Sequence, residues 1–320
     1  GGMDKVLETL ENDWDYKHFM CDGQMVMVLD YLDYRPENTE RVKKLASSGA
    51  LVLGPWYSLI DEFNSGGEFV VRNLLFGKKY ADELGGGMEV GYCPASFGHI
   101  AQMPQILAGF GFDTTMFSRG LTSKETPDME FVWEGSDGTR ALGVHMHESY
   151  TKSNFTLAVY RYAVVGVKED GAQPGIDNMN GVPFHMCDRD SAYRAFFHEL
   201  VPEYKVDGQI GLEKSLKLKE EMCERCTTPV MIFFDGVDQM EANPLVTKLI
   251  KDVNERLNTG DEIIHSSLPK FFEELKKEVD IDKLKVLKGE MRYPFFRHGG
   301  NGCYNNVSSA RMYQHRENEV

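Results

Sequence analysis

Apolar residues recur every three or four positions through much of the chain, the spacing that lines them along one face of a helix. In residues 4–19, for example, Val6 and Trp14 fall on the same side. The last of these segments is preceded by Ser266 and Ser267, either of which suits the N-cap of a helix. We therefore predict helices over residues 4–19, 25–34, 36–48, 67–84, 100–109, 191–200, 211–224, 244–257 and 267–277.

Short apolar runs bounded by turn-forming residues separate these helical segments, as expected for buried strands. The most strongly apolar of them is the run VMIFF at residues 230–234. Between 154 and 188 the pattern weakens, and we interpret that stretch as an excursion or long loop. Strands are predicted over residues 51–54, 89–92, 114–117, 131–133, 140–145, 230–234, 262–265 and 285–287.

The alternation of strands and helices indicates an α/β fold with a parallel sheet and crossover helices. In such sheets, ligands gather at the carboxyl ends of the strands. Three segments rich in candidate chemistry follow directly after predicted strands, namely after Val90, Phe117 and Phe234. We expect these segments to contribute to one functional site.

Composition narrows the classes of function. The chain has 320 residues, of which 42% are hydrophobic and 11% aromatic, so it can bury a substantial core. Its net charge of −15 argues against a nucleic-acid or anionic-membrane partner, whereas a neutral carbohydrate would be indifferent to that charge. No apolar run approaches the roughly 18 residues of a membrane span, and no signal-peptide pattern opens the chain.

The six cysteines are few and irregularly spaced, which is typical of a reducing compartment, and we predict a cytoplasmic protein. Gly1 and Gly2 resemble a processing scar before Met3 and are left out of the argument. The spacing of Cys223 and Cys226 allows a redox or metal-binding pair. The second Cys or His pair that a zinc knuckle needs is missing nearby, and the functional interpretation is disfavoured.

The most specific motif follows the strand at 89–92, where residues 91–99 read GYCPASFGH and are followed by IAQMPQIL. This segment resembles the signature of the family 38 glycoside hydrolases, the α-mannosidases. Their pattern runs aromatic-x-Pro-Asp-Ser-Phe-Gly-His, and its Asp is both the sugar nucleophile and a zinc ligand. Here that position is Ala95, whose methyl group can neither attack an anomeric carbon nor bind a cation.

The resemblance implies the fold of the family's catalytic domain. We expect a seven-stranded α/β barrel over residues 3–305, without the family's first strand, and the start of a helical bundle over 306–320. Full members also carry a helical bundle and β-sandwich regions. A missing strand would leave a sheet edge or a gap, covered by the segment 151–190 or by self-association into a homo-oligomer.

Retaining glycoside hydrolysis needs two carboxyl groups on opposite sides of the scissile bond. The segment FFDGVDQM at 233–240 resembles the family segment that supplies the general acid/base, a role that the match gives to Asp238. Asp235 lies beside it and is a candidate for substrate binding. The alternative is that Asp238 only caps the following helix or closes an Asx turn.

Further candidates for binding the sugar come from segments similar to the family's. Arg119 matches the arginine that orients the nucleophile, while Phe97 can pack on the apolar face of a sugar ring. Trp56 could stack on sugar, and Asp61 could accept its hydroxyl protons, although purely structural roles are equally open for both. Tyr150 is a weaker pocket candidate, and His99, beside Phe97, is expected to make a structural hydrogen bond.

Intact family members hold a zinc ion through a His-x-Asp pair on the first strand, the nucleophilic Asp and a later His. The opening His-x-His-Trp-Asp-Arg-Glu-Trp motif is absent here, and Ala95 offers no ligand. We therefore predict no zinc and no other cofactor in this chain. Metal roles are disfavoured for His145, His147 and His298.

These observations predict an α-mannosidase-like domain, a retaining hydrolase of α-mannosides by descent, whose partner is an α-mannoside oligosaccharide. Because the nucleophile and the metal ligands are missing, we expect this chain to be inactive. One alternative is a non-catalytic pseudoenzyme that binds mannosides. Another is a fragment without an independent function.

Overall fold

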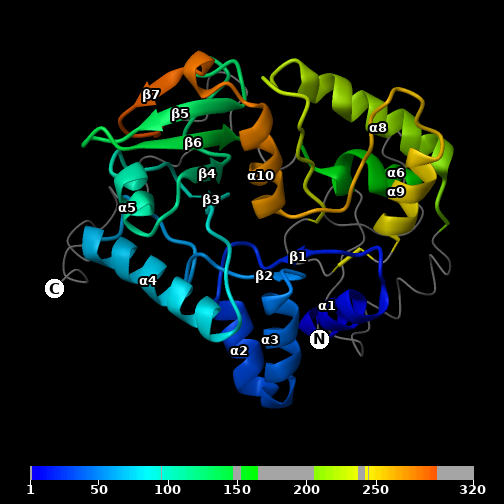
Figure 1. Cartoon of the computed structure of the whole chain (residues 1–320), viewed down its shortest axis with the longest axis horizontal. Coiled ribbons are helices and arrows are strands. Elements are labelled where there is room, and N and C mark those ends of the chain that lie inside the picture. Colours follow the sequence, from blue (N-terminus) through cyan, green and yellow to red (C-terminus); the bar gives the residue numbers. More distant parts are fainter. Residues whose placement is uncertain are drawn as a thin grey trace. The chain divides into compact units, whose positions relative to one another are not determined.

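A computed structural model describes residues 2–94, 96–146, 153–164, 205–236, 242–243 and 245–293 (Figure 1). The chain divides into two compact units, and a single catalytic-type domain over 3–305 stays a prediction. The first unit comprises Gly1–Phe19, Thr151–Cys223 and Ile232–Ser266, and the second comprises Met20–Tyr150, Glu224–Met231 and Ser267–Val320. The predicted helix over 191–200 and the segment 306–320 lie outside the described residues.

The second unit is built on a five-stranded sheet with the strand order β3-β4-β6-β5-β7. The neighbours β3, β4 and β6 run parallel, β5 is antiparallel to β6, and β7 is parallel to β5. A two-stranded sheet joins β1 (Phe19–Met20) to β2 (Leu51–Val52). The strands of the larger sheet are β3 (Gly91–Cys93), β4 (Thr114–Phe117), β5 (Glu130–Glu134), β6 (Arg140–His145) and β7 (Val286–Lys288).

The helices of this unit agree with the amphipathic segments of the sequence. Helix α10 has Ser267 at its N-cap position as predicted, but the serine side chain makes no capping hydrogen bond. A short 3₁₀ turn, η1, precedes α3, and another, η3, follows α10. The bounds are α2 (Val26–Tyr34), η1 (Pro36–Asn38), α3 (Thr39–Ser47), α4 (Gly67–Glu83), α5 (Met103–Gly109), α10 (Leu268–Glu278) and η3 (Ile281–Lys283).

Aromatic side chains make up much of the core beside the sheet. Phe117 meets the rings of Phe131 and Trp133 edge-on, with centroid separations of 5.9 and 5.6 Å, a favourable geometry for aromatic pairs. The indole N–H of Trp133 donates to the carbonyl of Gly289 at 2.9 Å, so the buried polar atom is satisfied. These contacts fix the carboxyl end of β4, where Arg119 follows.

The first unit is mainly helical. Its elements are α1 (Gly2–Asn12), the π-helical turn η2 (Thr156–Tyr160), α6 (Arg161–Ala163), α8 (Gly208–Cys223) and α9 (Val246–Asn254). At Gly211 helices α8 and α9 approach closely, because an added Cβ there would lie 2.7 Å from Leu249 and 2.9 Å from Val253. Glycine thus lets α8 pack directly on α9.

Two predicted strands are wrong. Residues 230–234 are half-buried and contain one isolated bridge, between Phe234 and Asn154, instead of a ladder. Residues 262–265 form no strand either, and Ile264 is 62% exposed. An apolar run supplies side chains for a sheet, but a strand also needs a neighbouring backbone along its length, and the described residues provide that to Phe234 alone.

The first helix is shorter than predicted. It ends at Asn12, and the carboxylate of Asp13 then accepts the backbone N–H of Asp15 at 2.9 Å, an Asx turn that competes with further helix. Trp14 is consequently 90% exposed instead of facing the core.

The α/β content of the second unit is confirmed, but the closed seven-stranded barrel and the missing first strand are not. None of the described helices is both long and apolar enough to cross a membrane.

We predict that Gly77→Ala destabilises the protein. In helix α4 a Cβ at Gly77 would lie 2.1 Å from the carbonyl oxygen of Pro55 and 2.3 Å from the backbone of Trp56, so the helix would have to move away. The expected loss in the free energy of unfolding is about 3 kcal/mol, the upper end of overpacking costs. Gly67→Ala on the same helix is the control, because nothing lies within 4 Å of its added Cβ. Equal denaturant midpoints for the two variants would contradict the packing argument.

His265 makes the stability of the first unit dependent on pH. Its ring packs on Tyr16 at 4.3 Å, and burial followed by the nearby charge of His18 lowers the pKa of His265 from 6.5 to about 4. Between these two values the unfolded chain binds a proton that the folded chain does not, so stability falls as the pH drops from 6.5 to about 4. We expect His265→Gln to flatten that part of the pH profile of the denaturation midpoint. An unchanged slope would refute this assignment.

Candidate functional site

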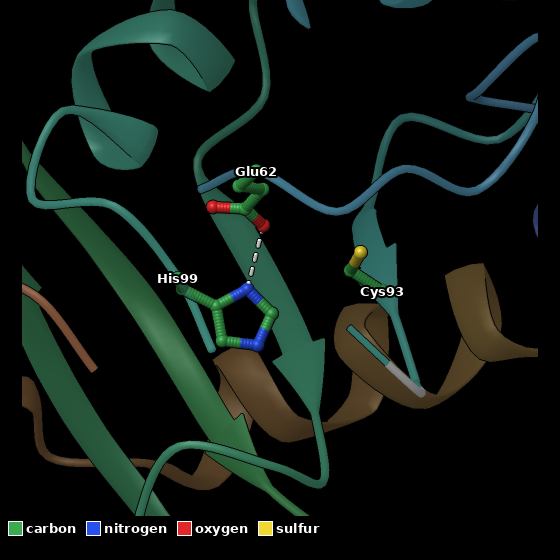
Figure 2. A group of neighbouring side chains, drawn as sticks. All are labelled: Glu62, Cys93 and His99. Carbon is green, nitrogen blue, oxygen red and sulfur yellow. Dashed lines mark hydrogen bonds and ion pairs between the residues drawn. The ribbon is translucent and has the colours of Figure 1, made fainter. Parts of the chain in front are cut away.

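The loop that follows β3 is held by a buried acid–imidazole pair. Nδ1 of His99 lies 2.7 Å from Oε1 of Glu62 (Figure 2). Oε2 of Glu62 accepts the backbone N–H of Ile100 at 2.8 Å. His99 is 1% exposed and Glu62 3% exposed. Both carboxylate oxygens are therefore used to join the loop after β2 to the signature loop, and the expected structural hydrogen bond of His99 is confirmed.

The same histidine is fixed through its backbone and its ring. His99 and Met291 exchange two backbone hydrogen bonds of 2.8 Å each, as in a single rung of an antiparallel ladder. The ring of His99 lies 4.1 Å from that of Phe117 and 6.0 Å from that of Trp133. Three segments far apart in the sequence thus meet at one residue of the signature loop.

Glu62, Cys93 and His99 are also the one group of three metal-ligand side chains within 4.8 Å of one another among the described residues (Figure 2). Their hydrogen bonds argue against a metal. Sγ of Cys93 lies 2.7 Å from the hydroxyl of Ser96, which donates to a backbone carbonyl at 3.0 Å. Burial, followed by the charge of Glu62, strongly raises the pKa of the Cys93 thiol, which disfavours the thiolate that binds metals. This group is a hydrogen-bonded anchor.

The signature loop brings Phe97 and Arg119 together. The guanidinium carbon of Arg119 lies 5.2 Å from the centroid of the Phe97 ring, within the range of a cation–π contact, and both residues are half-buried. Gly98 makes this turn with a φ of +104°, and an added Cβ would lie 2.8 Å from the carbonyl oxygen of Met291. Ala95, the position of the family nucleophile, lies outside the described residues.

Trp56 and Asp61 have structural environments. Trp56 is 1% exposed and donates its indole N–H to the carbonyl of Tyr92 at 2.9 Å, so the suggestion that it stacks on sugar is corrected: the ring belongs to the core. The carboxylate of Asp61 accepts the backbone N–H of Phe63 at 3.1 Å and the side-chain amide of Asn64. That arrangement closes an Asx turn within the loop.

Asp235 lies in the first unit, in a network of short polar side chains. Its Oδ1 accepts the hydroxyl of Thr156 at 2.7 Å and the amide of Asn243 at 2.6 Å, and Thr156 in turn accepts the backbone N–H of Gly236 at 2.7 Å. Asp235 is exposed as a whole residue. The protein around its carboxyl group nevertheless desolvates it and raises its pKa, and the two hydrogen bonds oppose that rise.

This network joins two residues that lie close in the sequence. Asp235 and Asn243 are joined directly, although seven residues separate them in the sequence. The candidate acid/base Asp238 lies between them and, like Tyr150, falls outside the described residues. The two groups of candidate residues, at Phe97 and at Asp235, belong to different units.

The comparison with protein families gives a direct match. Residues 2–298 fit the model of the glycosyl hydrolases family 38 N-terminal domain. The chain belongs to glycoside hydrolase family 38. The motifs at 91–99 and 233–240 lie within the matched range.

Relatives of this family 38 chain are glycosidases by name. It is 30% identical, over 99% of its length, to "Putative mannosylglycerate hydrolase" of Halalkalibacterium halodurans, of which it covers 31%. It is 35% identical over 108 residues, 32% of its length, to human "Alpha-mannosidase 2C1". The crystal structure of an α-mannosidase from Enterococcus faecalis matches 91% of the chain, with a TM-score of 0.68 and 25% identity, and the chain covers 28% of that protein. The chain thus spans about a third of the length of the H. halodurans and E. faecalis proteins, and its match covers 10% of the human protein.

Sequence reasoning missed Glu62 and the partners of Asp235. Asp61 and Glu62 are adjacent acids in one loop, and no local pattern shows which of them turns inward to meet His99. Thr156 and Asn243 lie 79 and 8 residues from Asp235, so their convergence depends on the fold.

We predict that Glu62→Gln lowers the free energy of unfolding by about 1–3 kcal/mol, because the amide keeps the shape but loses the charge-assisted bonds of a buried carboxylate. Glu68→Gln is the matched control, since the Glu68 side chain is 71% exposed and its pair with Arg72 is worth little. Denaturant unfolding measures both variants. If they are equally stable, the Glu62–His99 pair does not anchor the loop.

Proposed function

We propose that this chain is an α-mannosidase-like domain, by descent a retaining hydrolase of α-mannosides, which is inactive because Ala95 stands at the nucleophile position. The observation that carries the proposal is the signature itself, GYCPASFGH, in a chain of glycoside hydrolase family 38. The names of the relatives support a mannoside as the ligand. Because the chain covers a third or less of the length of these relatives, the activity of a longer protein is a separate matter.

The retaining mechanism explains why we expect no hydrolytic activity. A retaining mechanism forms a bond between a carboxylate and the anomeric carbon while a second carboxyl group protonates the departing oxygen. Asp238 is our candidate for the second role, whereas the methyl group of Ala95 cannot take the first. Without a covalent intermediate, protonation alone leaves the attack to a water that has no positioned base.

The zinc ion of intact family members does not fit the residues at hand. Ala95 has no ligand atom, His99 is hydrogen-bonded to Glu62 at 2.7 Å, and Sγ of Cys93 lies 2.7 Å from the hydroxyl of Ser96. We therefore derive no step through a metal. In this chain Phe97 and Arg119 would contact the ligand beside the signature loop.

A second function is a non-catalytic, mannoside-binding pseudoenzyme. The observation that favours it is the intact support of the signature loop, since Glu62, His99 and Gly98 hold the loop without any contribution from a nucleophile. Phe97 and Arg119 keep their mutual contact there. A binding role needs that surface and not the missing carboxylate.

We expect no hydrolysis of an activated aryl α-mannoside above the uncatalysed rate, because the covalent step has no nucleophile. Release of the aryl alcohol, followed by absorbance, measures this. If the chain does hydrolyse this substrate and Asp238→Asn abolishes the hydrolysis, the inactive assignment is wrong and Asp238 is the acid/base.

Calorimetric titration with mannose and mannobiose separates the remaining alternatives. Saturable binding supports the pseudoenzyme, and no heat supports a fragment without an independent function.

A further inference from the structure

Asp235 and Asn243 belong to a side-chain network in which every hydrogen-bond donor is used. The hydroxyl of Thr156 donates to Oδ1 of Asp235 at 2.7 Å and accepts the backbone N–H of Gly236 at 2.7 Å. The amide nitrogen of Asn243 has two N–H bonds, and it donates to Oδ1 of Asp235 at 2.6 Å and to the Thr156 hydroxyl at 3.1 Å. These side chains therefore have no donor left over.

Two acceptor oxygens of the same network remain. Asn243 is 1% exposed, and its buried Oδ1 receives no hydrogen bond from the described part of the chain. Both hydrogen bonds to the Asp235 carboxyl group end on Oδ1, and no Lys, Arg or His among the described residues pairs with its other oxygen, Oδ2. The network thus has more acceptors than donors, and the negative charge of Asp235 has no positive neighbour within that part of the chain.

The backbone on both sides of Asp235 is fixed. Phe234 donates its N–H to the carbonyl of Ser153 at 2.8 Å. The side-chain amide of Asn154 donates to the carbonyl of Gly236 at 2.6 Å. Asp235 is nevertheless exposed as a residue, although the surrounding protein desolvates its carboxyl group. Its carboxyl group is therefore held in one place and can be reached from solvent, as a binding site requires.

A hard divalent cation matches these two oxygens. Carboxylate and amide oxygens are ligands that Ca²⁺ and Mg²⁺ prefer, and a cation would also balance the charge of Asp235. A neutral hydroxyl group could donate to either oxygen but would leave that charge without compensation. Ca²⁺ suits the site better than Mg²⁺, because it accepts irregular geometry whereas Mg²⁺ demands a near-ideal octahedron.

We propose that Oδ2 of Asp235 and Oδ1 of Asn243 bind a calcium ion, with water molecules completing its coordination. The net charge of −15 favours a cation as the ligand of this chain. The site shares no residue with the zinc site that the family resemblance implies, and it departs from the prediction that the chain holds no cofactor. It does not depend on the proposed function.

Calorimetric titration of the chain with CaCl₂, after treatment with EGTA and its removal, tests this site. We expect saturable binding with a dissociation constant on the order of 0.1–1 mM, as for weak calcium sites, and weaker binding of MgCl₂. No saturable binding of calcium would overturn the proposal. If mannose gives a heat that Asp235→Asn abolishes and CaCl₂ gives none, the two oxygens accept sugar hydroxyls and the cation assignment is wrong.

Asp235→Asn assigns the ion to this carboxylate. The amide keeps an oxygen for the hydrogen bonds from Thr156 and Asn243 but removes the charge, so the calcium affinity should fall about tenfold or more. Asp261→Asn is the matched control, because Asp261 lies in the same unit and already pairs with Lys219, and it should leave the affinity unchanged. Equal affinities of the unaltered chain and Asp235→Asn would exclude Asp235 as a ligand.

Asn243→Asp distinguishes a calcium ligand from a purely structural amide. The change replaces a donor by a second carboxylate facing Asp235, so the thermal midpoint should fall in the absence of calcium. With calcium, both carboxylates would bind the ion, and the rise in the midpoint should exceed that of the unaltered chain. A midpoint of Asn243→Asp that calcium does not change would contradict the role of Asn243. The midpoints in EGTA show that each variant is folded.

Discussion

The contact between Glu62 and His99 is the constraint on which the signature loop depends. A carboxylate removed from water is costly unless its oxygens are satisfied, and here both are, one by an imidazole and one by a backbone N–H. Once that pair is buried, the loop after β2 and the loop after β3 cannot move independently. The exchange of hydrogen bonds between His99 and Met291 extends the same constraint to the segment after β7.

Much of the fold could be predicted from the sequence because its helices carry a clear apolar stripe. Helices α2, α4 and α10 begin and end within about two residues of the predicted bounds, and β4 occupies the predicted residues 114–117. The strand predicted over residues 230–234 is wrong because an apolar run does not by itself determine strand pairing. Their composition suits a strand, but pairing depends on backbone supplied from elsewhere, which no local pattern reveals.

The candidate site was predictable only in part. The motif located Phe97, His99 and Arg119, and the fold brings these residues together through rings and hydrogen bonds. Trp56 could not be judged from sequence, because a tryptophan beside a loop can be either an exposed platform or a core residue. Helix α4 approaches the backbone of Pro55 and Trp56 closely at Gly77, and the Trp56 side chain is buried in the core.

The bond between Asp235 and Asn243 has a consequence for how this family can vary. A segment whose two ends are already tied together costs little extra chain entropy when residues are added or exchanged within it, since closure cost grows only slowly with length. Insertions and substitutions between those two anchors would therefore leave the helices on either side undisturbed. The sequence between Asp235 and Asn243 could therefore change in evolution, or be replaced by protein engineering, independently of those helices.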